Sequence, residues 1–205
     1  MSAESEKIIG LYERQAQHWI ADRSRTGVSF EKPWLERFIA VPPAGKTILD
    51  IGCGTGQPIA DYLIAQSYQI TGIDSSPTLI ATCRNRLPSQ RWLVADMRTL
   101  ALAERFAGLI AWDSFFHLTP DDQRHMFPIF RANAATGAAL LFTSGPRHGE
   151  SIGEFHGEPL YHASLAPDEY RSLLAANGFA VVTEKMEDPD CGGHSVWLAQ
   201  RLEGR

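Results

Sequence analysis

The pattern of apolar and polar positions divides the chain into alternating strands and helices. Mostly apolar runs, which predict buried strands, lie at residues 47–53, 68–74, 91–96, 106–114 and 137–144. Segments with helix start or stop signals lie at 57–66, 77–87, 120–135 and 167–177. Strands that alternate with helices are typical of a parallel sheet with helices on both faces.

The two ends of the chain depart from this alternation. Segments 4–24 and 31–41 predict helices, the second ended by Pro42 and Pro43. The last two apolar runs, 179–186 and 194–201, have only a short connection between them, so we expect them to pair antiparallel. The predicted fold class is α/β: a doubly wound, mostly parallel seven-stranded sheet with one antiparallel C-terminal strand, helices on both faces and an N-terminal helical cover.

A glycine-rich turn after the first predicted strand carries the main chemical signal. Gly52, Gly54 and Gly56 alternate with other residues there, and glycine lets the backbone turn tightly and approach a ligand closely. The second predicted strand ends at Asp74, where a carboxylate can accept both hydroxyls of a ribose. The sequence therefore predicts a nucleoside site at the carboxyl ends of the first two strands.

The spacing of the glycines narrows the kind of nucleoside. A dinucleotide fingerprint reads G-x-G-x-x-G, but this chain reads G-x-G-x-G, and no Gly-Lys-Ser/Thr follows to make a P-loop. The stretch 49–56 resembles motif I of the class I S-adenosylmethionine-dependent methyltransferases, and Asp74 matches their second-strand acid. Segments 94–97 and 109–114 match two further positions, so the resemblance covers about residues 47–145.

The resemblance implies S-adenosyl-L-methionine as cofactor and S-adenosyl-L-homocysteine as product. Backbone groups of the glycine turn would receive the amino-acid end, aided by the N-terminus of the next helix, and Asp50 would orient the turn through backbone hydrogen bonds. The ribose would bind Asp74 and Ser75, the adenine Asp96 and Met97, and the methionine end Ser114. The complete predicted cofactor set is Tyr12, Trp19, Asp50, Gly52, Cys53, Gly54, Gly56, Asp74, Ser75, Asp96, Met97, Trp112 and Ser114.

Several of these residues also have a purely structural interpretation. Asp74 is alternatively a strand-end or helix-capping acid, although Ser75 and Ser76 offer better caps. Asp96 is alternatively a solvated loop acid. Trp112 lies in an apolar run and suits the core as well as a ligand. Tyr12 and Trp19 lie on one face of the predicted helix, in a Tyr-x-x-x-Ala-x-x-Trp pattern that is similar to small-molecule members of the family. They suit core packing equally.

The acceptor side of the predicted site rests on weaker signals. His117 follows the fourth strand and is the candidate general base, with a structural or solvated histidine as the alternative. Residues 145–165 form a long connection, which we expect to act as a substrate lid. The spacing of the histidines in this segment does not match a zinc site, so we expect no metal. The candidate acceptor-contacting residues of this segment are His148, His156, Tyr161 and His162.

Length, charge and cysteine usage restrict the class of protein. The chain has 205 residues, which suits one methyltransferase domain over 1–205 with a helical cover in 1–43. The formal net charge of −5 argues against a nucleic-acid partner, and no run has membrane-spanning length. Three scattered cysteines form neither a disulfide framework nor a zinc site, so we expect the protein to reside in the cytoplasm. We expect a monomer or a homodimer.

The residues therefore favour an enzyme that methylates a small molecule by in-line displacement. The nucleic-acid signature Asn/Asp-Pro-Pro-Tyr/Phe is absent where residues 112–115 read Trp-Asp-Ser-Phe. Two alternatives stay open: a transferase that uses a related S-adenosylmethionine derivative, and a non-catalytic protein that binds S-adenosylmethionine or S-adenosylhomocysteine. An NAD-dependent oxidoreductase is disfavoured by the glycine spacing.

Overall fold

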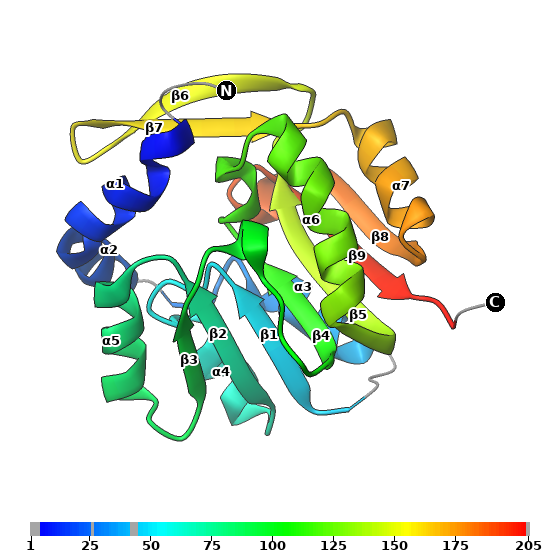
Figure 1. The fold of residues 1–205 in the computed structure, drawn as a ribbon, viewed down its shortest axis with the longest axis horizontal. Coiled ribbons are helices and arrows are strands. Elements are labelled where there is room, and N and C mark those ends of the chain that lie inside the picture. The colour runs from blue at the N-terminus through cyan, green and yellow to red at the C-terminus, as the bar shows by residue number, and fades with distance from the viewer. Residues whose placement is uncertain (1–4, 26, 42–44, 204–205) are drawn as a thin grey trace.

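The computed structural model describes residues 5–25, 27–41 and 45–203, and a twisted sheet runs through its centre (Figure 1). The strand order is β3-β2-β1-β4-β5-β9-β8, and within the described residues β9 alone runs against the other strands of this sheet. The strands are β1 (Thr47–Ile51), β2 (Gln69–Asp74), β3 (Arg91–Val94), β4 (Phe106–Ala111), β5 (Ala134–Ser144), β8 (Phe179–Asp188) and β9 (His194–Arg201). The predicted fold class is confirmed.

Helices cover both faces of the sheet and begin where the sequence signals place them. The Ser76 hydroxyl accepts from the Leu79 N–H at the start of α5, and Thr119 caps α6 through the Asp122 N–H. The helices are α1 (Ile8–Arg14), α2 (Ala16–Arg23), α3 (Lys32–Ala40), α4 (Ile59–Ala65), α5 (Pro77–Arg86), α6 (Pro120–Asn133) and α7 (Pro167–Ala176). Short 3₁₀ turns are η1 (Ser5–Lys7), η2 (Met97–Thr99), η3 (Phe115–His117) and η4 (Pro189–Cys191).

The N-terminal segment forms two helices where one was expected. Gln15 has non-helical dihedral angles between α1 and α2, so the helix axis changes direction there. Residue 4, the expected start, and Pro42 and Pro43, the expected stop of α3, lie outside the described residues. Figure 1 shows α1 and α2 beside the carboxyl end of the sheet, next to α5.

The connection expected to be an irregular loop is a β-hairpin. Strands β6 (Gly149–Phe155) and β7 (Glu158–Ser164) pair antiparallel around a turn at His156 and Gly157. Figure 1 shows this hairpin lying across the end of the sheet that α1 also covers. The strands could not be predicted from the sequence, because β6 is exposed along almost its whole length and therefore lacks apolar alternation.

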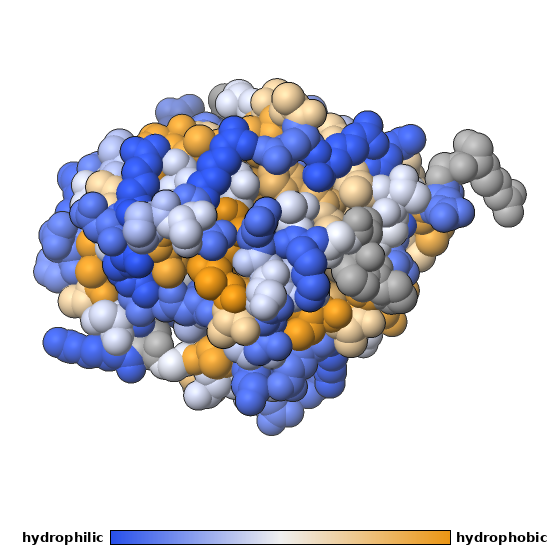
Figure 2. Space-filling model, turned by 90° about the horizontal axis from the view of Figure 1, so that it is seen from below, coloured by the Kyte–Doolittle hydropathy of each residue, from blue (hydrophilic) through white to orange (hydrophobic). Residues whose placement is uncertain are grey.

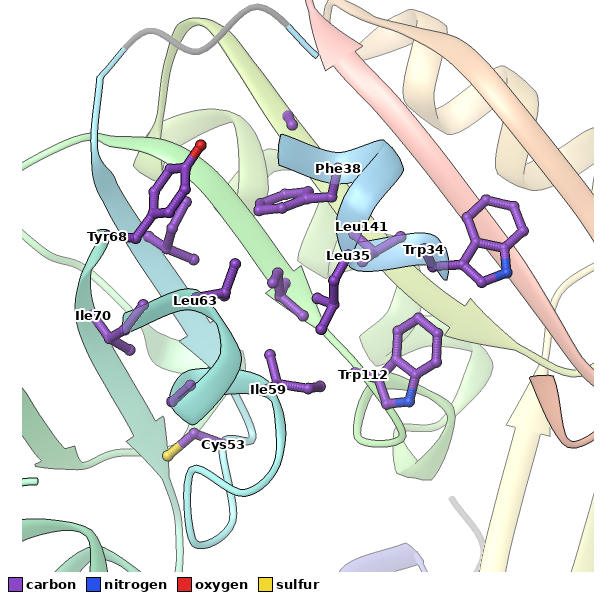
Figure 3. Packing of buried hydrophobic residues seen from close by; sticks show 14 of the residues in the cluster. Trp34, Leu35, Phe38, Cys53, Ile59, Leu63, Tyr68, Ile70, Trp112 and Leu141 are labelled. Atoms are coloured by element: carbon purple, nitrogen blue, oxygen red, sulfur yellow. The ribbon is translucent and has the colours of Figure 1, made fainter. Parts of the chain in front are cut away.

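Two apolar clusters fill the space on either side of the sheet. One packs α3 and α4 against β1 and β2, and contains Trp34, Phe38 and Leu63 (Figure 3). The other packs α6 and α7 against β4, β5 and β9. Trp112 is 6% exposed and belongs to the first cluster, so its role in the core is established whatever else it contacts. This packing holds the carboxyl ends of the strands in place.

The surface opposite the hairpin mixes polar and apolar side chains. Seen from below, orange residues are interrupted by blue ones rather than forming one broad patch (Figure 2). Among the described residues, no helix has both the length and the apolar character needed to cross a membrane.

Candidate functional site

A cavity of about 1080 Å³, its open mouth included, lies at the carboxyl ends of β1, β2 and β4 beneath α1 and α2. Gly56, which was expected at the ligand, does not line it; a Cβ on Gly56 would face Trp92 and Ala60 instead. The expected residues that do line the cavity are Tyr12, Trp19, Asp50, Gly52, Cys53, Gly54, Asp74, Ser75, Asp96, Met97, Trp112, Ser114 and His117.

The amide groups of the glycine turn are used inside the protein. The N–H groups of Gly52 and Cys53 both donate to the Ile73 carbonyl, and the Gly54 N–H donates to Asp74 Oδ2 at 2.9 Å. In this conformation these three N–H groups are therefore engaged within the protein. Helix α4, which follows a cis Gln57–Pro58 bond, has only 7 residues.

The role of orienting the turn, expected of Asp50, belongs to Asp74. Asp74 orients the turn, because its carboxylate accepts the N–H of Gly54 and, at 2.9 Å, that of Ser76. Asp50 makes no hydrogen bond to the described residues of the turn and faces the cavity. Burial, together with the nearby charge of Asp74, raises the pKa of Asp50 to about 7, and burial also raises the pKa of Asp74.

Two glycines allow the close approaches that shape the cavity. A Cβ on Gly54 would lie 2.7 Å from Trp19 Nε1, and one on Gly52 would lie 2.3 Å from the Ser114 Cβ. Both glycines have positive φ, +55° and +74° respectively, a region that other residues adopt at a cost. The Ser114 hydroxyl donates to the Ile51 carbonyl at 2.7 Å, so it supports the turn.

Trp19 presents an unpaired donor to this cavity. Its Nε1 is buried and has no hydrogen-bond partner, which is costly unless a ligand supplies one. Arg23, one turn further along α2, also lines the cavity and forms an ion pair with Glu31 at 3.1 Å. Glu31 is only 4% exposed. Arg23 was not among the predicted site residues, although a basic residue one helical turn after Trp19 indicates that both lie on the same face of the helix.

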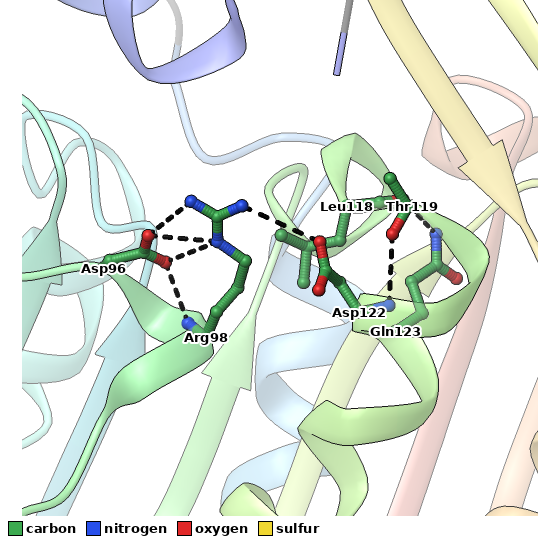
Figure 4. A network of polar contacts seen from close by, with 6 residues as sticks. All are labelled: Asp96, Arg98, Leu118, Thr119, Asp122 and Gln123. Carbon is green, nitrogen blue, oxygen red and sulfur yellow. Dashed lines mark hydrogen bonds and ion pairs between the residues drawn. The ribbon is translucent and has the colours of Figure 1, made fainter. Parts of the chain in front are cut away.

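The Asp96 side of the cavity is closed by a charged network. Arg98 donates to both carboxylate oxygens of Asp96 and lies 3.7 Å from Asp122 at the start of α6 (Figure 4). These contacts lower the pKa of Asp96 against the opposing effect of its burial. Met97 and Ala95 supply apolar lining beside this network. Asp96 is thus part of an ion pair rather than a solvated loop acid.

His117 is held neutral between two groups. Its Nδ1 lies 2.9 Å from the Tyr161 carbonyl oxygen and its Nε2 lies 2.8 Å from the Tyr12 hydroxyl. A carbonyl only accepts, so Nδ1 carries the proton and Nε2 accepts from Tyr12. Burial lowers the pKa of His117 to about 4. Both ring nitrogens of the candidate base are therefore engaged by protein groups, although the ring lines the cavity.

The hairpin closes the cavity from above by contacts with the N-terminal helices. The Phe155 ring packs on Tyr12 and Trp19, with centroid distances of 5.8 and 6.1 Å. Glu158 accepts from Arg14 and Gln15, and His156 Nε2 lies 2.9 Å from Asp22. Entry of a ligand from this side requires these contacts to open.

A second cavity of about 880 Å³, its open mouth included, is lined by residues of β6, β7 and β9 and by Phe116 of η3. Asp113, which lines the first cavity, lies 3.7 Å from His194 of the second. The residues that line the second cavity include Phe116, Arg147, His148, Glu150, His162 and His194. No group of three or more acidic, histidine or cysteine side chains suited to a metal ion occurs in the part of the chain that the structure describes.

Comparison with known proteins agrees with this geometry. Residues 48–137 match the family model described as a methyltransferase domain. A curated protein named O-methyltransferase rstn1, from Aspergillus nomiae, is 30% identical over 152 residues, which are 67% of this chain and 66% of that protein. A trans-aconitate 2-methyltransferase from Variovorax paradoxus is 29% identical over 114 residues, 54% of this chain. That match spans only 43% of the relative's length.

Among solved structures, a Burkholderia thailandensis 1,6-didemethyltoxoflavin-N1-methyltransferase, solved with bound 1,6-didemethyltoxoflavin and S-adenosylhomocysteine, has the same fold. The TM-score is 0.74, and the alignment covers 99% of this chain and 92% of that one. Sequence identity is 17%, so the likeness extends to the fold and not to the ligands.

Proposed function

We propose that this chain, which belongs to the S-adenosylmethionine-dependent methyltransferases with a Rossmann-like fold, methylates a small molecule. The observation that carries the proposal is the first cavity, in which the glycine turn, the Asp74 carboxylate and the unpaired Trp19 Nε1 converge. S-adenosylmethionine supplies an electrophilic methyl group to a nucleophile. The protein's contribution is to hold the two reactants aligned, which in well-oriented models lowers a barrier by roughly 7–11 kcal/mol.

The residues of the first cavity fit the chemistry of this cofactor. Each Asp74 oxygen accepts one backbone N–H and retains a lone pair for a ribose hydroxyl. Trp19 Nε1 and the Arg23 guanidinium suit the cofactor's carboxylate, and Asp50 suits its positive charge. The apolar side chain of Met97 suits the adenine face, next to Asp96. These assignments make Arg23 an addition to the set expected from sequence.

The acceptor is proposed to enter beneath the hairpin. Residues 145–165, which include β6 and β7, then act as the substrate lid, and residues before β1 act as the cover of a single domain. The contacts of Phe155 with Tyr12 and Trp19 support this, because they join lid and cover above the first cavity. The proposed compartment is the cytoplasm, supported by three cysteines that are all buried free thiols.

Isothermal titration with S-adenosylhomocysteine, S-adenosylmethionine and NAD tests the proposal. We expect the two sulfur compounds to bind in the micromolar range and NAD to give no heat of binding. Asp74→Ala should weaken binding by about 1.5–3 kcal/mol through loss of a charged hydrogen-bond acceptor. Glu36→Ala, at an exposed acidic residue of α3 outside the cavity lining, is the matched control. Binding of NAD alone would refute the proposed cofactor.

A further inference from the structure

The boundary between the two cavities is formed by the segment after β4. Asp113 of that segment lines the first cavity, and Phe116 lines the second. Asp113 Oδ1 faces His194 Nδ1, at 3.7 Å, across this boundary. A carboxylate that lines the first cavity and an imidazole that lines the second therefore form a pair between the two cavities.

Asp113 is held in a strained backbone conformation at this boundary. Its φ is +49°, in the left-handed region, and its N–H donates to the Thr143 hydroxyl at 2.9 Å. The same hydroxyl donates to Asp113 Oδ1 at 3.2 Å, and Thr143 is fully buried. Strain of this kind persists only where the surroundings enforce it, and such residues cluster at functional sites. Thr143 thus fixes the carboxylate that faces His194.

The His194 ring is placed to contact a molecule in the second cavity. With Nδ1 toward Asp113, Nε2 is the nitrogen without a hydrogen bond to the described residues. The ring lies parallel to Phe116, with centroids 6.2 Å apart and planes 6° apart, and His162 packs on Phe116 at 5.3 Å. These rings form a wall suited to a flat conjugated group.

His194 also differs from His117 in having a route for protons. Both nitrogens of His117 are occupied, by the Tyr12 hydroxyl and the Tyr161 carbonyl. The His194 side chain is 37% exposed, so a proton taken up there can leave to water. Of these two histidines, His194 alone combines an unoccupied nitrogen, an adjacent carboxylate and contact with solvent.

We propose that the second cavity receives a planar acceptor with an O–H or N–H nucleophile, and that His194 Nε2 accepts its proton. The proposal rests on the proposed function. The bond from the nucleophile to hydrogen breaks, a bond from Nε2 to hydrogen forms, and the electron pair stays on the nucleophile for attack. The imidazolium is balanced by Asp113, and its proton then passes to water. His194 is the catalytic residue, and Asp113 is a positioning residue.

The probe 4-nitrophenol tests the proton transfer without turnover, because its phenolate absorbs visible light and its phenol does not. At a pH below the pKa of the free probe, the wild-type protein should produce the phenolate band on binding. His194→Gln should abolish the band, whereas His125→Gln, on the exposed side of α6, should leave it unchanged. An equal band in His194→Gln, or no binding of the probe by the wild-type protein, would overturn the proposal.

Titration of each variant with S-adenosylhomocysteine separates this proposal from the proposed function. Unchanged binding in His194→Gln shows that the variant is folded, so the loss of the band is then specific to the imidazole. If the wild-type protein fails to bind S-adenosylhomocysteine, the proposed function fails whatever the probe does. If S-adenosylhomocysteine binds but the band survives in His194→Gln, only the role of His194 fails.

The positioning role of Asp113 is tested with the same probe. Asp113→Asn should weaken the phenolate band of bound 4-nitrophenol, because the negative charge that faces the imidazolium at 3.7 Å is lost. A band as strong as that of the wild-type protein would show that Asp113 does not act on His194. The titratable and charged groups that face His194 or line its cavity are Asp113, Arg147, His148, Glu150, His162 and, across the β8–β9 ladder, Asp188.

Discussion

At the scale of single residues, Asp50 and His117 are buried groups whose pKa values are shifted in opposite directions. The pKa of Asp50 rises from 3.8 to about 7, so its contribution to stability is complete below pH 3.8 and is lost as the pH rises through about 7. The pKa of His117 falls from 6.5 to about 4, so its contribution is complete above pH 6.5 and is lost as the pH falls through about 4.

Replacing either residue should therefore tilt the pH profile of stability. Relative to the wild-type protein, Asp50→Asn should gain stability as the pH rises from 4 to 7, by up to about 4 kcal/mol. His117→Gln should instead gain stability, relative to the wild-type protein, as the pH falls from 6.5 to 4. Urea unfolding across this pH range measures both. Tilts of the same sign would contradict the assigned ionisation states.

Gly54 combines a positive φ with the contact to Trp19, and the two effects can be separated. Gly54→Ala should lower the free energy of unfolding by roughly 1–2 kcal/mol and also weaken S-adenosylhomocysteine binding, because the methyl group displaces Trp19. Gly137→Ala is the matched control, since Gly137 has a φ of +81° with nothing within 4 Å of its Cβ position. It should lose stability but keep the affinity. Equal affinities of the Gly54→Ala and Gly137→Ala variants for S-adenosylhomocysteine would show that Trp19 does not contact the ligand.

At the scale of elements, the hairpin and the N-terminal helices form one joined cover. Phe155→Ala should speed dissociation of S-adenosylhomocysteine by roughly 3–10-fold, because aromatic contacts with Tyr12 and Trp19 are lost. Ile152→Ala, on the same strand and 54% exposed, should leave the rate unchanged. Stopped-flow fluorescence measures both rates. A rate that is insensitive to Phe155 would mean that ligands leave by another path.

The elements themselves were predictable to different degrees. Strands β1, β2 and β4 followed from their apolar runs, because burial on both faces leaves a clear signal, and α6 followed from its Thr119 cap. The hairpin did not, since an exposed strand obeys no apolar period. The motif predicted that most of the expected residues would line the cavity. The hydrogen bond from the Gly54 N–H to Asp74 could not be predicted, because it depends on tertiary geometry and not on the spacing of residues.

At the scale of the whole molecule, ligand binding should add to stability, because the first cavity is built from distant parts of the chain. Tyr12, Asp74 and Ser114 reach it from three different segments. S-adenosylhomocysteine at about 100 times its Kd should add roughly 2.7 kcal/mol to the free energy of unfolding. Chemical unfolding with and without the ligand measures the gain. A gain of the same size in Asp74→Ala would place the ligand elsewhere.

The position of β9 has a consequence for the order in which the protein is completed during synthesis. β9 follows β8 along the chain but lies between β5 and β8 in the sheet. A nascent chain that has reached β8 therefore has no neighbour for that strand, and the edge of β5 is bare. Until residues 194–201 emerge, both strands offer unpaired backbone to proteases and to other chains. The strand that follows β8 along the chain thus closes the sheet.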